Sequence, residues 1–532
     1  MKKIWIYSSL VLLGHFALQA CESQSNKGDS GANEQVNDPY YDGVTESDDK
    51  TSAGSPDGEW IEEEITLENG NTEAYAYLPE NDFLSPSTNP LSTFSIDVDN
   101  ASYTNCRRMI TAGSKPQVDA VRSEEFINYF KYDYAVPTKD EVFSVQTEMG
   151  NCPWNDKAKL LHIGLQGYTV ATEKLPPANL VFLIDVSGSM DDENKLPLLK
   201  KSFKLLVDKL NAEDKVAIVT YAGDERLVLE STSCKDREEI KDAIDNLASG
   251  GSTNGAGGIQ MAYEQALKGF LPNGNNRVIL ASDGDFNVGA SSDGELTRII
   301  EEKRDQGVYL TILGFGMGNY KDSKMESLAD HGNGNYFYID DIRESNRVLV
   351  SNLAGTLLTI AKDVKIQVEF NPELVSEYRL VGYENRLMNA EDFEDDTKDA
   401  GELGAGHTVT AIYEIIPGKS QKSSLKYQAV SSSGSTELAN IKLRYKKPKS
   451  DKSELIEVAV TDKDHSWESN SANYQFAVAV AGFSLILRES KHIEGFDYDD
   501  VLDICKAVKF ADEMEKYEFM RLVEEAKLIG EA

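Results

Sequence analysis

Residues 179–190 have the sequence NLVFLIDVSGSM, in which five aliphatic and aromatic residues lead directly into a carboxylate, two hydroxyls and a glycine. A short, uninterrupted apolar run predicts a strand buried on both faces, as in parallel sheets that are covered by helices. Gly188 permits a tight loop after this strand. We therefore expect the side chains of Asp185, Ser187 and Ser189 to lie together at the carboxyl end of a buried strand.

The same pattern of buried strands and amphipathic helices continues along the chain. Three further apolar runs predict partner strands, at Val216–Val219, Val278–Leu280 and Val308–Leu313. Apolar residues recur with helical spacing in 196–210 and 259–270, and Arg343–Ala361 is expected to form a closing helix. This alternation predicts an α/β fold with a doubly wound, mostly parallel sheet between two layers of helices.

Both flanks of this α/β region show the period-two alternation that is typical of antiparallel strands. We expect the two flanks to pair into one β-sandwich from which the α/β domain projects. A chain of 532 residues exceeds the roughly 250 to 300 residues of a single core. The predicted segments are a lipoprotein signal peptide (1–20), a disordered acidic tether (21–88), a strand-rich N-terminal region (89–174), the α/β domain (175–362), an antiparallel β region (363–465) and a C-terminal helical region (466–532).

The N-terminus has the features of a secretory signal. Lys2 and Lys3 precede an apolar stretch, Ile4–Leu18, that is too short for a membrane-spanning helix. The following residues, LQAC at 18–21, resemble the lipobox of bacterial lipoproteins, whose cysteine is acylated. The resemblance implies a lipid anchor at Cys21 and a location on a membrane of the bacterial cell envelope. An ordinary signal peptide with an unmodified cysteine is the alternative.

The charge and the cysteines exclude several classes of function. A formal charge of -36, from 54 basic and 90 acidic residues, argues against a nucleic acid partner, because phosphates are bound by clustered Lys and Arg. The cysteines after residue 21 form no C-x-x-C pattern, which argues against zinc and thiol redox chemistry. A disulfide between Cys106 and Cys152 is permitted in an oxidising compartment.

Two further segments can reach the carboxyl edge of the predicted sheet. Thr253 lies on a glycine-rich loop before a helix, and Asp283 follows the apolar run Val278–Leu280. With Asp185, Ser187 and Ser189, they supply only oxygen donors. Such a set suits a hard divalent cation: Mg²⁺ fits best because it keeps several waters, with Mn²⁺ and Ca²⁺ as alternatives. A second ion at Asp97 and Asp99 is less favoured than a solvated turn.

This order of residues, Asp-x-Ser-x-Ser, then Thr, then Asp-Gly, resembles the metal-ion-dependent adhesion site (MIDAS) of von Willebrand factor type A (VWA) domains. The resemblance implies that the hydroxyls contact the ion, that the carboxylates hold it directly or through water, and that a partner carboxylate completes the octahedron. Three flanking segments are similar to a bacterial envelope family that is often labelled as calcium-activated chloride channel homologues. They are 94–99, 121–130 and 404–410.

The sequence therefore predicts a lipid-anchored envelope protein that binds an acidic residue of a partner protein through the metal. No His-Glu-x-x-His, phosphate-binding loop or Gly-x-Ser-x-Gly motif is present, so we expect no enzyme. One alternative is an envelope scaffold in which the metal only stabilises the fold. A Mg²⁺-dependent hydrolase is a weaker alternative, because no general base is evident. As a further alternative, the five residues could serve only to cap loops and turns, as Asp, Ser and Thr often do. They would then bind no metal.

Overall fold

The computed structural model describes most of the chain after residue 72. The described residues are 73–138, 141–252, 255–284, 293–318, 320–421, 434–461 and 467–531. The predicted signal peptide, Cys21 and Thr253 lie outside these ranges.

The α/β domain is built on a six-stranded sheet with the strand order β6-β5-β4-β7-β8-β9. All neighbours are parallel except the edge pair β5 and β6. The first strand along the chain, β4, lies in the middle, and the strand order reverses between β4 and β7. The strands are β4 (Ala178–Asp185), β5 (Lys215–Tyr221), β6 (Glu225–Ser233), β7 (Asn275–Ser282), β8 (Tyr309–Gly314) and β9 (Tyr336–Tyr338).

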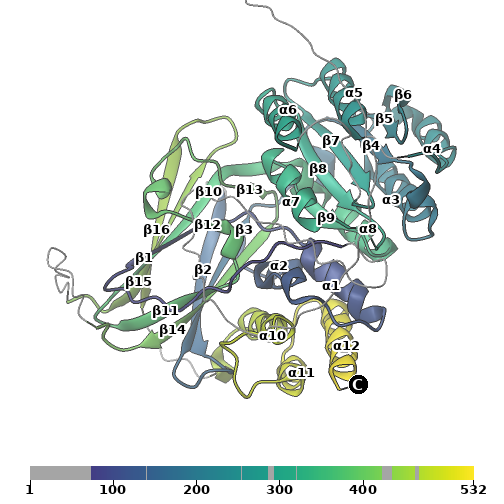
Figure 1. The fold of residues 1–532 in the computed structure, drawn as a ribbon. Coiled ribbons are helices and arrows are strands. Elements are labelled where there is room, and N and C mark those ends of the chain that lie inside the picture. Colours follow the sequence, from purple (N-terminus) through teal and green to yellow (C-terminus); the bar gives the residue numbers. More distant parts are fainter. Residues whose placement is uncertain are drawn as a thin grey trace, which may run out of the picture. The chain divides into compact units, whose positions relative to one another are not determined.

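Helices cover both faces of this sheet (Figure 1). Leu180 and Phe182 of β4 point into one core, whereas Val181 and Leu183 point into the other, so every side chain of the run is buried. This arrangement confirms the predicted doubly wound fold. One layer contains α3 (Leu196–Lys209), α4 (Arg237–Asp245), α8 (Ile342–Asn346) and α9 (Leu353–Leu357), and the other α5 (Gly255–Lys268), α6 (Asp293–Asp305) and α7 (Asp322–His331).

The strands before and after the α/β domain pair with each other. β1 is antiparallel to β10, and β3 is antiparallel to β14, so the expected β-sandwich of the two flanks is confirmed. One sheet of the sandwich has the strand order β12-β1-β10-β15-β16, and β13 also pairs with β10. The other sheet has the order β11-β14-β3-β2. Their bounds are β1 (Leu91–Ser95), β2 (Phe143–Asn151), β3 (Lys159–Gly167), β10 (Thr359–Phe370), β11 (Val375–Val381), β12 (Leu387–Met388), β13 (Gly401–Gly404), β14 (Thr408–Pro417), β15 (Glu437–Lys446) and β16 (Ser453–Thr461).

Helices from both ends of the folded chain share a further core, separate from those of the α/β domain and of the sandwich. Its centre is α10, which is apolar on all sides and buried along nearly its whole length. Among the described residues, no helix combines the length and the hydropathy needed to cross a membrane. The helices are α1 (Ala101–Thr111), α2 (Ser123–Tyr129), α10 (Ala472–Leu487), α11 (Tyr498–Ala507) and α12 (Glu513–Gly530).

Residues 73–88, the last part of the predicted disordered tether, are bound to the folded domains. The backbone N–H of Ala74 donates to the carbonyl of Tyr320 at 3.0 Å, and Leu84 and Tyr378 exchange two backbone hydrogen bonds. The prediction was wrong here because this segment is held by hydrogen bonds to residues far away in the sequence, which its local composition does not reveal.

The prediction of a closing helix at Arg343–Ala361 is also wrong at the C-terminal end of that helix. A π-helical turn, Arg347–Ser351, interrupts it, and β10 begins at Thr359. Ile360 and Ala361 are buried in the core of the sandwich, so tertiary packing overrides the local helical pattern.

The permitted disulfide is not formed. Cys106 and Cys152 are separate buried thiols, and burial raises the pKa of both.

Candidate functional site

The loop after β4 brings three predicted donors together. Asp185 is fully buried, and one of its carboxylate oxygens accepts the backbone N–H of Ser187 at 2.8 Å. The hydroxyls of Ser187 and Ser189 lie 3.0 Å apart. The loop lies at the carboxyl end of β4, where the strand order reverses and where open α/β sheets bind ligands.

The glycine-rich loop that carries Thr253 is attached to this first loop. Gly250 donates its backbone N–H to the carbonyl of Val186 at 2.7 Å, and Gly188 donates to the carbonyl of Gly251 at 3.1 Å. Gly251 has a φ of 89°, which favours glycine. The described part of this loop ends at Ser252, next to the loop that carries Asp185, Ser187 and Ser189. Thr253 itself lies outside the described residues.

Asp283 follows β7, the neighbour of β4, and is also fully buried. Its Oδ2 accepts a hydrogen bond from the Lys195 ammonium at 3.0 Å. Within the described structure, its Oδ1 has no hydrogen-bond partner. A buried carboxylate oxygen without a partner is costly, so it is a natural place for a missing ligand.

The electrostatics of the site fit a cation. Burial, together with the charge of Asp283, raises the pKa of Asp185 to about 6, against the lowering effect of its hydrogen bonds to Ser187. Among the described residues, no group of three or more His, Cys, Asp or Glu side chains is placed to hold a metal. The donor set is therefore two carboxylates and hydroxyls. This donor set matches Mg²⁺, which is usually bound by one or two protein carboxylates and keeps several of its water ligands.

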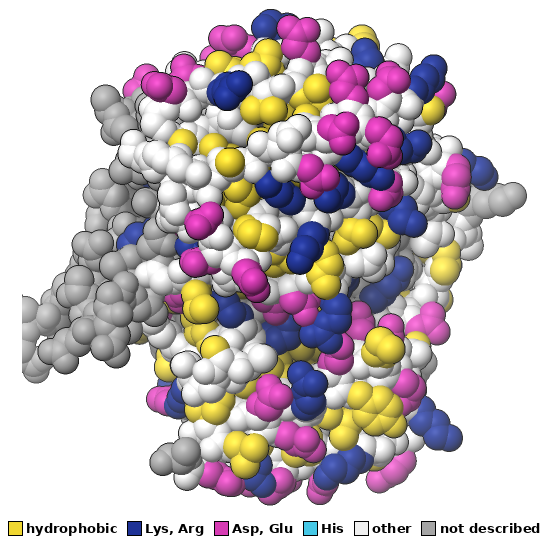
Figure 2. Space-filling view, turned by 90° about the vertical axis from the view of Figure 1, so that its right-hand side faces the viewer, with side chains coloured by type: hydrophobic (Ala, Val, Ile, Leu, Met, Phe, Trp, Pro, Cys, Tyr) yellow, Lys and Arg dark blue, Asp and Glu magenta, His cyan; other side chains and the backbone are white. Residues whose placement is uncertain are grey.

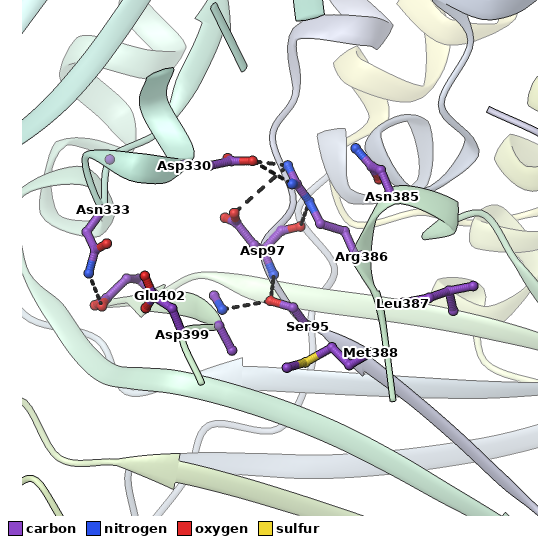
Figure 3. A pocket seen from close by; sticks show the side chains of 13 residues that line it. Ser95, Asp97, Asp330, Asn333, Asn385, Arg386, Leu387, Met388, Asp399 and Glu402 are labelled. Carbon is purple, nitrogen blue, oxygen red and sulfur yellow. Dashed lines mark hydrogen bonds and ion pairs between the residues drawn. The ribbon is translucent and has the colours of Figure 1, made fainter. Parts of the chain in front are cut away.

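A separate cavity of about 220 Å³ lies between the α/β domain and the sandwich. Figure 3 shows Arg386 reaching toward Asp97 and Asp330, with Asn333 beside Glu402. Asp99 is buried, accepts the backbone N–H of Tyr336 at 2.8 Å and lies 3.5 Å from Arg386. The solvated turn that the sequence favoured at Asp99 is therefore wrong, because Asp99 joins two parts of the fold.

Three acidic residues of α7, spaced four apart, connect the α/β domain to both the N-terminal flank and the sandwich. Asp322 and Glu326 bind the guanidinium of Arg122, which is only 3% exposed. Glu326 and Asp330 bind Arg386 at 2.9 and 2.7 Å. The spacing puts the three carboxylates on one helical face, a pattern that could have been noticed in the sequence.

The carboxyl of Glu402, in this cavity, is expected to make stability dependent on pH. Burial raises its pKa to about 8 from an ordinary 4.5. Between these values the folded protein holds a proton that the unfolded chain releases, so this contribution to stability is present at low pH and is lost as the pH rises. Glu402→Gln, which is always neutral, should be more stable than the wild type at pH 8.5 by about 2 kcal/mol.

Urea unfolding at pH 5 and pH 8.5 measures this effect. Glu457→Gln, an exposed residue of β16, is the matched control and should leave the pH dependence unchanged. A Glu402→Gln protein with the same pH dependence as the wild type would show that Glu402 is ionised in the folded protein.

Three protein families match consecutive parts of the chain. The family described as "von Willebrand factor" matches residues 69–162, the von Willebrand factor type A domain matches 179–350, and "Uncharacterized protein YfbK, C-terminal" matches 355–529. The second match contains the six-stranded sheet together with Asp185, Ser187, Ser189 and Asp283.

Individual proteins match as well. YfbK from Escherichia coli (strain K12) is 40% identical over 473 residues, which cover 86% of this chain and 82% of YfbK. The human inter-alpha-trypsin inhibitor heavy chain H2 is 29% identical over 169 residues, 29% of this chain and 17% of that protein. The solved structure of a von Willebrand factor type A protein from Catenulispora acidiphila aligns with 74% of this chain and 91% of its own, at 15% identity and a TM-score of 0.42.

Proposed function

Since this chain belongs to the family of bacterial von Willebrand factor type A proteins that includes YfbK, we propose that it binds a partner protein through a divalent cation and catalyses no reaction. The observation that carries the proposal is the pair of fully buried carboxylates, Asp185 and Asp283, at the carboxyl ends of two adjacent strands. The unpartnered Oδ1 of Asp283 and the paired hydroxyls of Ser187 and Ser189 supply further oxygen donors beside them.

Each residue has a distinct task in this proposal. Ser187, Ser189 and Thr253 would contact the ion, and Asp185 and Asp283 would hold it directly or through water. Bound Mg²⁺, or Mn²⁺ or Ca²⁺ in its place, would supply an open coordination position for an acidic residue of the partner. The backbone N–H of Ser187 keeps the Asp185 carboxylate oriented before any ion binds.

The surface charge supports a protein partner. On the face drawn in Figure 2, Lys and Arg side chains lie among Asp and Glu side chains and do not form one continuous basic stripe. Nucleic acid binding needs clustered basic residues, and the formal charge of the whole chain is -36, so we propose no nucleic acid partner.

Capture of envelope proteins on the immobilised protein tests this function. With Mg²⁺ present, a specific partner should bind the wild type, elute with EDTA and fail to bind Asp185→Ala. A partner that stays bound in EDTA and also binds Asp185→Ala would favour the alternative, a structural scaffold.

We further propose that Cys21 is acylated and anchors the protein to a membrane of the cell envelope. Acyl chains contribute about 0.8 kcal/mol per buried CH₂ group, which makes the anchored form partition into detergent. Cys21→Ser should move the protein from the detergent phase to the aqueous phase, and mass spectrometry should find acyl groups only on the wild-type N-terminal peptide. An unmodified Cys21 in the wild type would contradict the anchor.

A further inference from the structure

Lys195 is a buried cation inside the candidate metal site. It is 5% exposed and precedes the first residue of α3. Its ammonium donates to the Asp283 carboxylate at 3.0 Å and to the carbonyl of Ser189 at 2.9 Å. Lys195 therefore joins the two strand-end loops that carry the predicted metal ligands.

The lysine side chain is confined to this position. Gly316, with a φ of 76°, passes so close that a Cβ there would lie 2.3 Å from the Lys195 Cε. Among the described residues, the other carboxylate that forms an ion pair with Lys195 is that of Asp192, which is 3.8 Å away and whose side chain is 74% exposed to solvent. The ammonium is thus directed at Asp283 by packing.

The position of Lys195 changes the net charge of the site that a bound ion would occupy. Counted as formal charges, Asp185, Asp283 and Lys195 together carry one net negative charge, whereas the two carboxylates alone would carry two. A divalent ion would then leave the site with a net positive charge, which a carboxylate from outside would neutralise. In a buried site such an imbalance is weakly screened.

We propose that Lys195 is a built-in counter-ion that keeps the affinity for divalent cations low until an acidic group of the partner supplies the missing negative charge. Metal and partner would consequently bind together. Lys195 is a positioning residue in this scheme, since it acts through Asp283. The inference rests on the proposed function and adds to it how metal binding is regulated.

Calorimetric titration of Mn²⁺ alone into the full-length chain tests the proposal. Lys195→Met should bind Mn²⁺ at least about tenfold more tightly than the wild type, because the repulsion is removed. A purely structural role would have the opposite effect and weaken binding. Lys201→Met, an exposed lysine of the same helix, is the matched control and should bind like the wild type.

Thermal unfolding in EDTA provides a second readout. Without its cation, the buried Asp283 should lower the melting temperature of Lys195→Met, and Mn²⁺ should raise it by more than it raises that of the wild type. If Lys195→Met does not fold, Lys195→Gln, which keeps a donor toward the Ser189 carbonyl, replaces it in both measurements.

The outcomes separate the two proposals. Equal or weaker Mn²⁺ binding by the Lys195 variants, with binding lost in Asp185→Ala, would overturn the role of Lys195 and leave the metal site standing. Absence of Mn²⁺ binding in the wild type and in every Lys195 variant would overturn the metal site and this inference with it.

Discussion

Asp185→Asn is expected to abolish saturable Mg²⁺ and Mn²⁺ binding, with a loss of affinity of about 100-fold or more. The same change should stabilise the metal-free protein at pH 8. Burial and the neighbouring Asp283 raise the pKa of Asp185 to about 6, so its ionised form is unfavourable in the folded state. Removing that charge should contribute about 1 to 2 kcal/mol to the free energy of unfolding above pH 6.

Thermal unfolding in EDTA and in saturating Mg²⁺ measures both effects. The wild type should gain stability with Mg²⁺, by about 2.7 kcal/mol at 100 times the dissociation constant, whereas Asp185→Asn should gain none. Asp191→Asn alters an exposed carboxylate of the same loop and should behave like the wild type. A variant that binds Mg²⁺ normally, or that is destabilised in EDTA, would show that Asp185 only holds the loop.

The second large effect is expected at Arg122. Its guanidinium, 3% exposed, binds Glu125 of α2 and both Asp322 and Glu326 of α7. Arg122→Met would leave the buried carboxylates of Glu125 and Asp322 without the cation that they share, whereas Glu326 would keep its contact with Arg386. Breaking a buried ion pair in this way costs about 3 to 5 kcal/mol, so we expect a loss of that size in the free energy of unfolding.

Urea unfolding, followed by far-ultraviolet circular dichroism, measures this loss. Arg343→Met is the control, because Arg343 is 63% exposed and its ion pairs with Asp341 and Glu518 should contribute less than about 1 kcal/mol. Since Arg122 joins the N-terminal flank to the α/β domain, the wild type should unfold in one transition. A loss below 1 kcal/mol for Arg122→Met would mean that the two regions are held together by other contacts.

Local patterns were sufficient to predict four of the six strands of the α/β domain, β4, β5, β7 and β8, whereas the edge strands β6 and β9 were not predicted. The run in β4 is apolar at every position because Leu180 and Val181 face two different cores. The pairing of the flanks followed from their period-two alternation. The loop residues Asp185, Ser187 and Asp283 could be placed because the carboxyl ends of adjacent parallel strands meet at one edge of a sheet.

Other features depend on contacts between residues far apart in sequence. Lys195 looks like an ordinary solvated lysine among acidic neighbours, and only the fold brings it to Asp283. Asp99 could not be assigned without Arg386, which lies 3.5 Å away but 287 positions later. The backbone hydrogen bonds of the ordered segment 73–88 go to residues far away in the sequence, so its local composition does not show that it is ordered.

The most direct test of the metal site is a crystal structure of the protein grown with Mn²⁺, examined with data collected at the Mn absorption edge. The proposed function predicts one anomalous peak within about 2.5 Å of the Ser187 and Ser189 hydroxyls, beside Asp185 and Asp283. The same map would place Thr253. Absence of a peak there at saturating Mn²⁺, or a peak only among Asp97, Asp330 and Glu402, would contradict a metal-dependent binding site on this sheet.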